Sequence, residues 1–152
     1  MSIQFSDLIH FNLPKEKVFN GLTDLDAAKH WMKGFLGIEM IKGTKIEPGA
    51  VFRETRKMYG RKATEEFEVV SVVPHNEIKL RVDGTKGTSG KGEFLFHYKL
   101  EDNNGGTNVT FNGEIKGLKG IAAFFGKLFA GSFKKACVKD LQSLKSYLES
   151  QN

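Results

Sequence analysis

The C-terminal part of the chain, residues 118–150, reads LKGIAAFFGKLFAGSFKKACVKDLQSLKSYLES. Apolar side chains recur in it at intervals of three and four residues, which is the spacing of one face of an α-helix. The residues on this stripe are Ile121, Phe125, Leu128, Phe129, Phe133, Ala136, Cys137, Leu141, Leu144 and Leu148. The pattern predicts one long helix. In its first half, Ala122, Ala123 and Phe124 spread the apolar surface around most of the helix, so this half must face something other than water.

The spacing of apolar residues is different in the part of the chain that precedes this helix. Between residues 38 and 116, apolar and polar residues alternate, and turn-forming groups such as Glu47-Pro48-Gly49 and Pro74-His75-Asn76 interrupt the alternation. No helical spacing separates the alternating segments, which indicates an antiparallel meander rather than β-α-β units. The expected strands are residues 38–46, 51–59, 62–73, 77–83, 92–101 and 107–116.

The first residues of the chain predict one more strand and two short helices. Residues 3–13 alternate between apolar and polar side chains, as a half-buried strand does. Pro14 favours a first helical turn, and Val18 and Phe19 follow it at helical spacing. A second short helix is expected over residues 25–32. The predicted order is therefore one strand, two helices, six strands and a long helix.

Composition and charge exclude several classes of protein. The 152 residues, with 39% hydrophobic and 27% charged side chains, are typical of one globular domain. The net charge of +5 is spread along the chain, so no nucleic-acid partner is expected. The longest apolar-rich stretch is broken by Lys127, which argues against a transmembrane segment. The single cysteine, Cys137, and the absence of a leader-like N-terminus predict a cytoplasmic protein.

Several short motifs add a family resemblance to this order of elements. Residues 11–19, FNLPKEKVF, followed by Leu22-Thr23-Asp24, resemble the opening of START-like (SRPBCC) domains, and Trp31, Pro48-Gly49 and Gly106-Thr107 match their loose consensus. The chain is most similar to the polyketide cyclase/dehydrase-like and lipid-transport-like small proteins of that superfamily. The resemblance implies an α+β helix-grip fold over residues 1–152, in which a seven-stranded antiparallel sheet curls around the C-terminal helix, with two short helices after the first strand.

The same resemblance implies a function. Its members suggest binding or carriage of a small hydrophobic ligand, of lipid or polyketide/aromatic type, in a cavity between sheet and helix. Two alternatives stay open, because one fold carries several functions. One is a cyclase/dehydratase-type enzyme that uses the same cavity, and the other is an Hsp90-activator-like protein-interaction domain. Peripheral contact with a membrane and binding to a partner protein also remain possible.

Strand parity selects the residues that would line such a cavity. Polar residues in phase with apolar ones are the informative positions, because a buried polar group needs a partner. Arg53 is in phase with Val51 and could anchor a ligand carboxylate or phosphate; alternatively, Arg53 and Glu65 pair across neighbouring strands or lie exposed. Trp31 is either a core anchor or part of the cavity mouth. The predicted ligand-binding residues are Trp31, Arg53, Tyr59, Glu65, Phe67, Phe96, Tyr98, Phe125, Phe129 and Phe133.

Other motifs do not support catalysis or cofactor binding. The glycine-rich residues 84–92 join two strands and open no helix, so they are expected to form a hairpin loop rather than a phosphate site. The four histidines have no metal-ligand spacing. Cys137 is expected to be a small buried hydrophobe. No catalytic residue, metal site or cofactor is therefore predicted.

Overall fold

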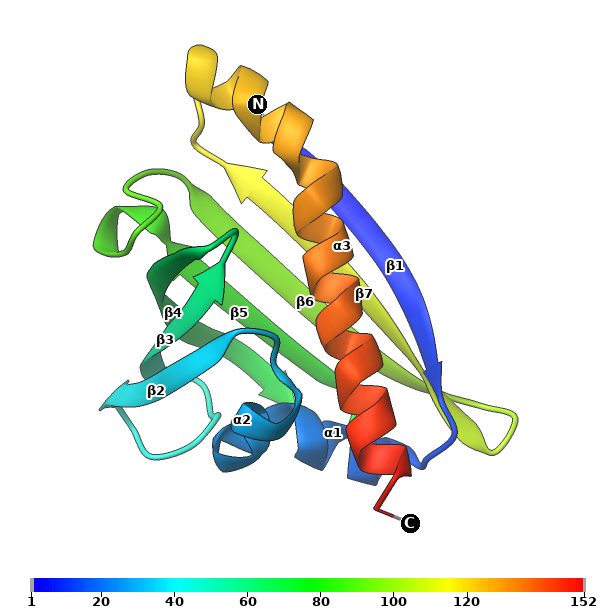
Figure 1. Ribbon diagram of the computed structural model, residues 1–152. Coiled ribbons are helices and arrows are strands. Elements are labelled where there is room, and N and C mark those ends of the chain that lie inside the picture. The colour runs from blue at the N-terminus through cyan, green and yellow to red at the C-terminus, as the bar shows by residue number, and fades with distance from the viewer. Residues whose placement is uncertain (1, 152) are drawn as a thin grey trace.

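The computed structural model describes residues 2–151, apart from the side chains of residues 121–125 and 127–129. One antiparallel sheet of seven strands forms the body of the molecule, in the order β1-β7-β6-β5-β4-β3-β2 (Figure 1). The strands are β1 Ile3–Phe11, β2 Phe35–Lys42, β3 Val51–Met58, β4 Arg61–Val73, β5 Glu77–Asp83, β6 Glu93–Asn103 and β7 Gly106–Lys116. The predicted seven-stranded sheet is confirmed.

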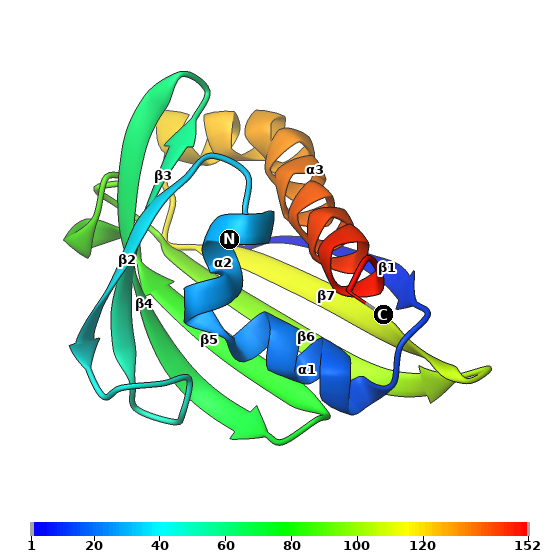
Figure 2. The same cartoon turned by 60° about the horizontal axis from the view of Figure 1, so that its bottom comes forward.

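The helices lie against the concave side of the sheet. They are α1 Lys15–Thr23, the short 3-10 helix η1 Leu25–Ala27, α2 Ala28–Trp31 and α3 Ile121–Glu149, and a second 3-10 helix, η2 Gly84–Lys86, precedes β6. Figures 1 and 2 show α3 crossing the sheet, with α1 and α2 at one end of the curled strands. The predicted long helix and the two short helical segments after β1 are both present. Asp24 begins the second segment, since its side chain accepts hydrogen bonds from the backbone N–H groups of Asp26 and Ala27.

The second strand is the element whose predicted bounds were wrong. It was expected over residues 38–46, whereas β2 begins at Phe35 and ends at Lys42. Gly34 explains the early start, because its φ of +68° turns the chain directly after α2 into the sheet. Gly43, with φ of +83°, explains the early end, because it turns the chain away from the sheet before residue 46.

The tightest packing lies at the end of the molecule where α1 meets α3. Phe11 of β1, Val18 of α1, Val109 and Phe111 of β7, and Leu144 of α3 are all fully buried there. A buried hydrogen bond of 2.7 Å, donated by the Thr107 hydroxyl to the Leu13 carbonyl, ties the start of β7 to the end of β1. Side chains therefore fill the space beneath the last turns of α3, around Leu144.

Candidate ligand cavity

An inner cavity of about 390 Å³ separates α3 from the strands at the β3 side of the sheet. Its walls come from α1, η1, α2, β3, β4, β5, β6 and α3, and most of the surface they present is apolar. The apolar wall includes Leu22, Leu25, Met32, Ile46, Phe52, Met58, Phe67, Ile78, Leu80, Val82, Phe94, Phe96 and Leu141. The cavity thus lies between sheet and helix, where the resemblance implied one.

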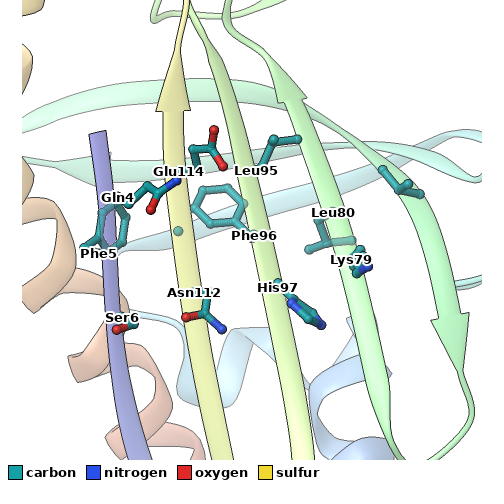
Figure 3. Close-up of a pocket in the computed structure, with 12 residues that line it drawn as sticks. Gln4, Phe5, Ser6, Lys79, Leu80, Leu95, Phe96, His97, Asn112 and Glu114 are labelled. Atoms are coloured by element: carbon teal, nitrogen blue, oxygen red, sulfur yellow. The ribbon is translucent and has the colours of Figure 1, made fainter. Parts of the chain in front are cut away.

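A second hollow, of about 490 Å³, lies on the outer face of the sheet. Figure 3 shows Ser6, Asn112, His97 and Lys79 in it, and their register places them in one row across β1, β7, β6 and β5. Its charges are already paired, since Glu77 lies 2.7 Å from His97 and 3.4 Å from Lys79. More of the surface of this outer groove is polar, and its His97 Nε2 is buried beside the Glu77 carboxylate without a hydrogen bond from or to any described residue. The inner cavity has the larger share of apolar wall. The inner cavity is therefore the candidate site.

The structure brings seven of the ten predicted ligand-binding residues to the inner cavity. They are Trp31, Tyr59, Glu65, Phe67, Phe96, Tyr98 and Phe133. Tyr59 lies at the rim, 76% exposed, at the tip of the β3–β4 hairpin with φ of +52°. Phe125 and Phe129 fall among the residues whose side chains the structure does not describe.

Phe133 shows how α3 closes the cavity without filling it. Its ring centroid lies 5.6 Å from that of Phe5, 6.2 Å from that of Phe94 and 6.0 Å from that of Phe96. These contacts hold α3 against β1 and β6 at ordinary distances for aromatic pairs. The free volume then extends from Phe133 toward β3 and β4.

The prediction that Arg53 faces the cavity was wrong. Its side chain is on the outer face of β3, 47% exposed, with Nε 3.4 Å from the Glu66 carboxylate. The strand has the opposite orientation to the one expected, because Phe52 and Met58 face inward in place of Val51. The alternative fits Arg53 better, because its side chain is exposed and meets a carboxylate of the neighbouring strand, although that carboxylate belongs to Glu66 and not to Glu65.

The inward face of β3 instead carries Arg56, which was missed. Its Nη1 and Nη2 donate to the two carboxylate oxygens of Asp140 on α3, both at 2.7 Å. Its Nε and Nη2 also donate to the Lys33 carbonyl, at 3.0 and 2.7 Å. Arg56 therefore connects β3, α3 and the segment after α2. A signal was present in the sequence, because Asp140 interrupts the apolar stripe of α3 between Cys137 and Leu141.

Glu54, also missed, is the second charged residue on this face of β3. It lines the cavity and is 7% exposed, and its nearest cationic atom, Nη1 of Arg56, is 3.6 Å away. That separation is longer than a hydrogen bond, and no residue in the described part of the chain donates one to this carboxylate. Burial raises the pKa of Glu54 to about 7, with Arg56 lowering it and Asp140 raising it further.

Tyr98 and Cys137 add two neutral polar groups near Glu54. Burial raises the pKa of the Tyr98 hydroxyl well above its ordinary value and that of the Cys137 thiol to about 12, and the charge of Asp140 adds to both effects. Tyr98 lies deep in the fold but keeps surface toward the cavity. At neutral pH the thiol stays protonated, as expected of a small buried hydrophobe rather than a nucleophile.

Glu65 organises the rim of the cavity. Its Oε1 accepts hydrogen bonds from the Ser89 N–H at 2.8 Å and from the Ser89 hydroxyl at 2.6 Å. The N–H of Thr88 donates to the Thr64 carbonyl, which fastens the same loop to β4. Oε2 of Glu65 is buried and has no hydrogen-bond partner among the described residues. Glu65 thus holds the β5–β6 loop beside the cavity.

The described residues include neither a cluster of metal ligands nor a membrane-spanning helix. Across the described residues, no three His, Cys, Asp or Glu side chains are close enough to hold a metal ion. Within the same residues, no helix has the length and apolar character needed to cross a bilayer.

The sequence matches the family described as polyketide cyclase / dehydrase and lipid transport over residues 2–149. No curated protein sequence matches it. The match therefore covers nearly the whole chain, including every strand and helix that lines the cavity.

Solved structures share the fold at low sequence identity. Major latex-like protein 151 from Panax ginseng is 10% identical with a TM-score of 0.81, and 97% of each chain is covered. The protein Ara h 8.0201 is 15% identical with a TM-score of 0.78 over 99% of each chain. DynU16, titled a putative protein in the dynemicin biosynthetic locus, is 17% identical with a TM-score of 0.73, over 98% of this chain and 48% of that one. These similarities establish the helix-grip fold.

Proposed function

The chain belongs to the polyketide cyclase/dehydrase and lipid transport family, and we propose that it binds a small hydrophobic ligand in the cavity beneath α3. One observation carries the proposal. The cavity of about 390 Å³ falls within the usual range for small-molecule sites, and its walls are mostly apolar with a few polar groups among them. Such a composition favours a ligand with a hydrophobic body.

Trp31 provides a direct test of binding. It is the only tryptophan of the chain and lines the cavity, so a ligand that enters should change the intensity or wavelength of its fluorescence. We expect saturable changes on titration with hydrophobic probes such as 1-decanol. Native mass spectrometry of gently purified protein, followed by extraction, should identify a natural ligand.

A cavity-filling variant separates this binding from surface adsorption. Ala136 lines the cavity from α3, so Ala136→Phe should occupy the free volume and weaken 1-decanol binding by about tenfold or more. Gln142→Phe introduces the same side chain at an exposed position of α3 and should leave binding unchanged. Equal binding by the wild type and Ala136→Phe would show that the probe does not use this cavity.

Glu54 supports a second candidate function, an enzyme of the cyclase/dehydratase kind. Its carboxyl group lines an apolar cavity and has a pKa raised to about 7, which is the range suited to general acid–base chemistry at neutral pH. Glu54 would remove a proton from a carbon next to a ligand carbonyl, and the neutral Tyr98 hydroxyl would donate to the enolate oxygen that forms.

Hydrogen exchange tests this second candidate. Wild-type protein should accelerate the exchange of the α-hydrogens of 2-decanone with deuterated water, as followed by NMR, with a rate that rises with pH through about 7. Glu54→Gln should remove the acceleration while retaining 2-decanone binding measured by Trp31 fluorescence. Binding without acceleration in the wild type would leave carriage as the function.

The single cysteine supports a cytoplasmic location as a further part of the proposal. Cys137 is a free thiol, and its raised pKa keeps it in the less reactive protonated form. A reducing compartment suits a protein without disulfides. Fractionation of cells that express the chain, followed by detection of the protein in each fraction, tests this location.

A further inference from the structure

We propose that the cavity selects hydrophobic molecules whose head group donates a hydrogen bond and carries no negative charge, and that Glu54 and Tyr98 hold this head group. The inference rests on the proposed binding function and specifies the chemical class of the ligand. It follows from which polar groups at this end of the cavity are already satisfied and which are not.

The first step is the unused acceptor capacity of Glu54. A carboxylate offers about four lone-pair sites. In the described structure Glu54 receives no hydrogen bond, and its one ion-pair contact, with Arg56, spans 3.6 Å. A buried, poorly paired carboxylate is unfavourable unless a donor reaches it. Because Glu54 lines the cavity, a ligand hydroxyl or ammonium group can supply that donor.

The second step is that, among the described residues lining the cavity, the one cationic side chain, Arg56, is already committed. Four hydrogen bonds commit Arg56 to Asp140 and to the Lys33 carbonyl. The carboxylate of Asp140 compensates the guanidinium charge, and Glu54 adds a further negative charge when it is ionised. A ligand carboxylate placed here would face Glu54 with no donor from Arg56 to compensate it. The one arginine that was predicted to bind an anion, Arg53, lies on the outer face.

The third step concerns two further polar residues on the cavity wall. Tyr98 lines the cavity, and its hydroxyl can donate to or accept from a head group beside Glu54. Trp31 is 6% exposed, lines the cavity and, among the described residues, finds no acceptor for its Nε1–H. Trp31 therefore points independently to a ligand, and one that also carries an acceptor.

The remaining wall suits the body of such a ligand. The Phe52 and Phe67 rings are stacked with centroids 5.1 Å apart and planes within 2°, and Phe67 continues to Phe96 at 6.2 Å. These three rings from β3, β4 and β6 form a continuous apolar surface next to Glu54 and Tyr98. A ligand with a polar head and an apolar body can satisfy both parts of the cavity at once.

Three probes with one tail test the selection. Decylamine, 1-decanol and decanoate differ only in the head group, and their dissociation constants can be measured by Trp31 fluorescence. At about pH 8.5, where Glu54 is ionised, we expect decylamine and 1-decanol to bind about tenfold or more tightly than decanoate. Decanoate binding as tightly as the other two would overturn the proposal. Failure of all three probes to bind would instead count against the proposed binding function.

Variants assign the selection to individual residues. Glu54→Gln removes the negative charge and keeps the shape, so it should bring the decanoate dissociation constant within about threefold of that for decylamine. Glu68→Gln, at an exposed position on the same sheet, removes the same charge and should leave the selection intact. Tyr98→Phe should weaken 1-decanol binding about threefold or more. Unchanged selection in a folded Glu54→Gln variant would overturn the role of Glu54.

Discussion

The two faces of the sheet treat charge in different ways. On the outer face, His97 and Lys79 share the Glu77 carboxylate, and Arg53 pairs with Glu66 beside open solvent. On the inner face, Arg56 donates four hydrogen bonds to Asp140 and the Lys33 carbonyl, whereas Glu54 receives no hydrogen bond from any described residue. The same strands therefore carry solvated ion pairs on one side and an incompletely satisfied polar cluster on the other.

This difference teaches where charge matters energetically. Exposed ion pairs contribute little to stability because water and salt already screen them. Groups that are removed from water depend on their partners, and the loss of one partner is strongly unfavourable. Substitutions on the inner face should consequently have large effects, and matching substitutions on the outer face should have small ones.

The largest effect is expected for Arg56→Met. The change leaves the Lys33 carbonyl without its guanidinium donors and Asp140 with only the Lys33 N–H, so the free energy of unfolding should fall by about 3–5 kcal/mol. Urea unfolding at about pH 6 measures it. The double variant Arg56→Met/Asp140→Leu should recover most of the loss, because it also removes the abandoned carboxylate. If the free energy of unfolding of the single variant fell by less than about 1 kcal/mol, the Arg56–Asp140 pair would contribute no more than an exposed ion pair does.

Glu54→Gln should produce the next largest effect, in the opposite direction. The folded protein holds the Glu54 proton more tightly than the unfolded chain, because burial raises its pKa from the ordinary 4.5 to about 7. The contribution of this group to stability is therefore greatest below pH 4.5 and declines as the pH rises through about 7. At about pH 8 the glutamine variant should be more stable by about 2–3 kcal/mol.

Thermal or urea unfolding between about pH 5 and pH 8 measures this effect. The wild type should lose stability relative to Glu54→Gln across that range, while Glu68→Gln should follow the wild type. If the free energy of unfolding had the same pH dependence in the wild type and in Glu54→Gln, ionisation of Glu54 would not destabilise the fold. The inner face would then resemble the outer face at this position.

Tyr98→Phe should change the free energy of unfolding by less than about 1 kcal/mol. Tyr98 lines the cavity, so in the ligand-free protein we expect the loss of its hydroxyl to abandon no buried donor or acceptor. Urea unfolding of the ligand-free protein provides the measurement. A loss of more than about 2 kcal/mol would indicate that the hydroxyl already makes a structural hydrogen bond, for instance through water.

The smallest effect is expected on the outer face, for Arg53→Ala. This arginine is 47% exposed and its contact with Glu66 is long, so its removal should change stability by less than about 0.5 kcal/mol. The difference from wild type should shrink further in high salt. An effect comparable to that of Arg56→Met would remove the contrast between the two faces.

Much of the fold could be predicted because the spacing of apolar residues and the turn-forming residues determine secondary structure locally. The stripe of α3, the seven strands and the helical segments after β1 were all predicted, and only the bounds of β2 were clearly displaced, by the turns at Gly34 and Gly43. The matching parity of Phe94, Phe96 and Tyr98 also predicted their shared inward face correctly.

The polar part of the cavity was harder to predict, because β3 carries charged residues at both parities. Val51 and Arg53 alternate with Phe52 and Glu54, and the choice depends on packing against β4 and α3. Phe52 and Met58 offered the better signal, since the two largest apolar side chains of the strand share the parity of Glu54 and Arg56. Asp140 within the apolar stripe of α3 offered a second signal, and its partner was visible only in three dimensions.

The link between Arg56 and Asp140 also bears on how the chain folds. The two residues are 84 positions apart, and α3 follows every strand of the sheet in the sequence. Contacts of such large separation form late and slowly, because a long loop must close first. During synthesis α3 therefore cannot cover the concave face of the sheet until the last residues of the chain have been made. A nascent chain at that stage exposes a wide apolar surface, which makes it a substrate for chaperones and prone to aggregation.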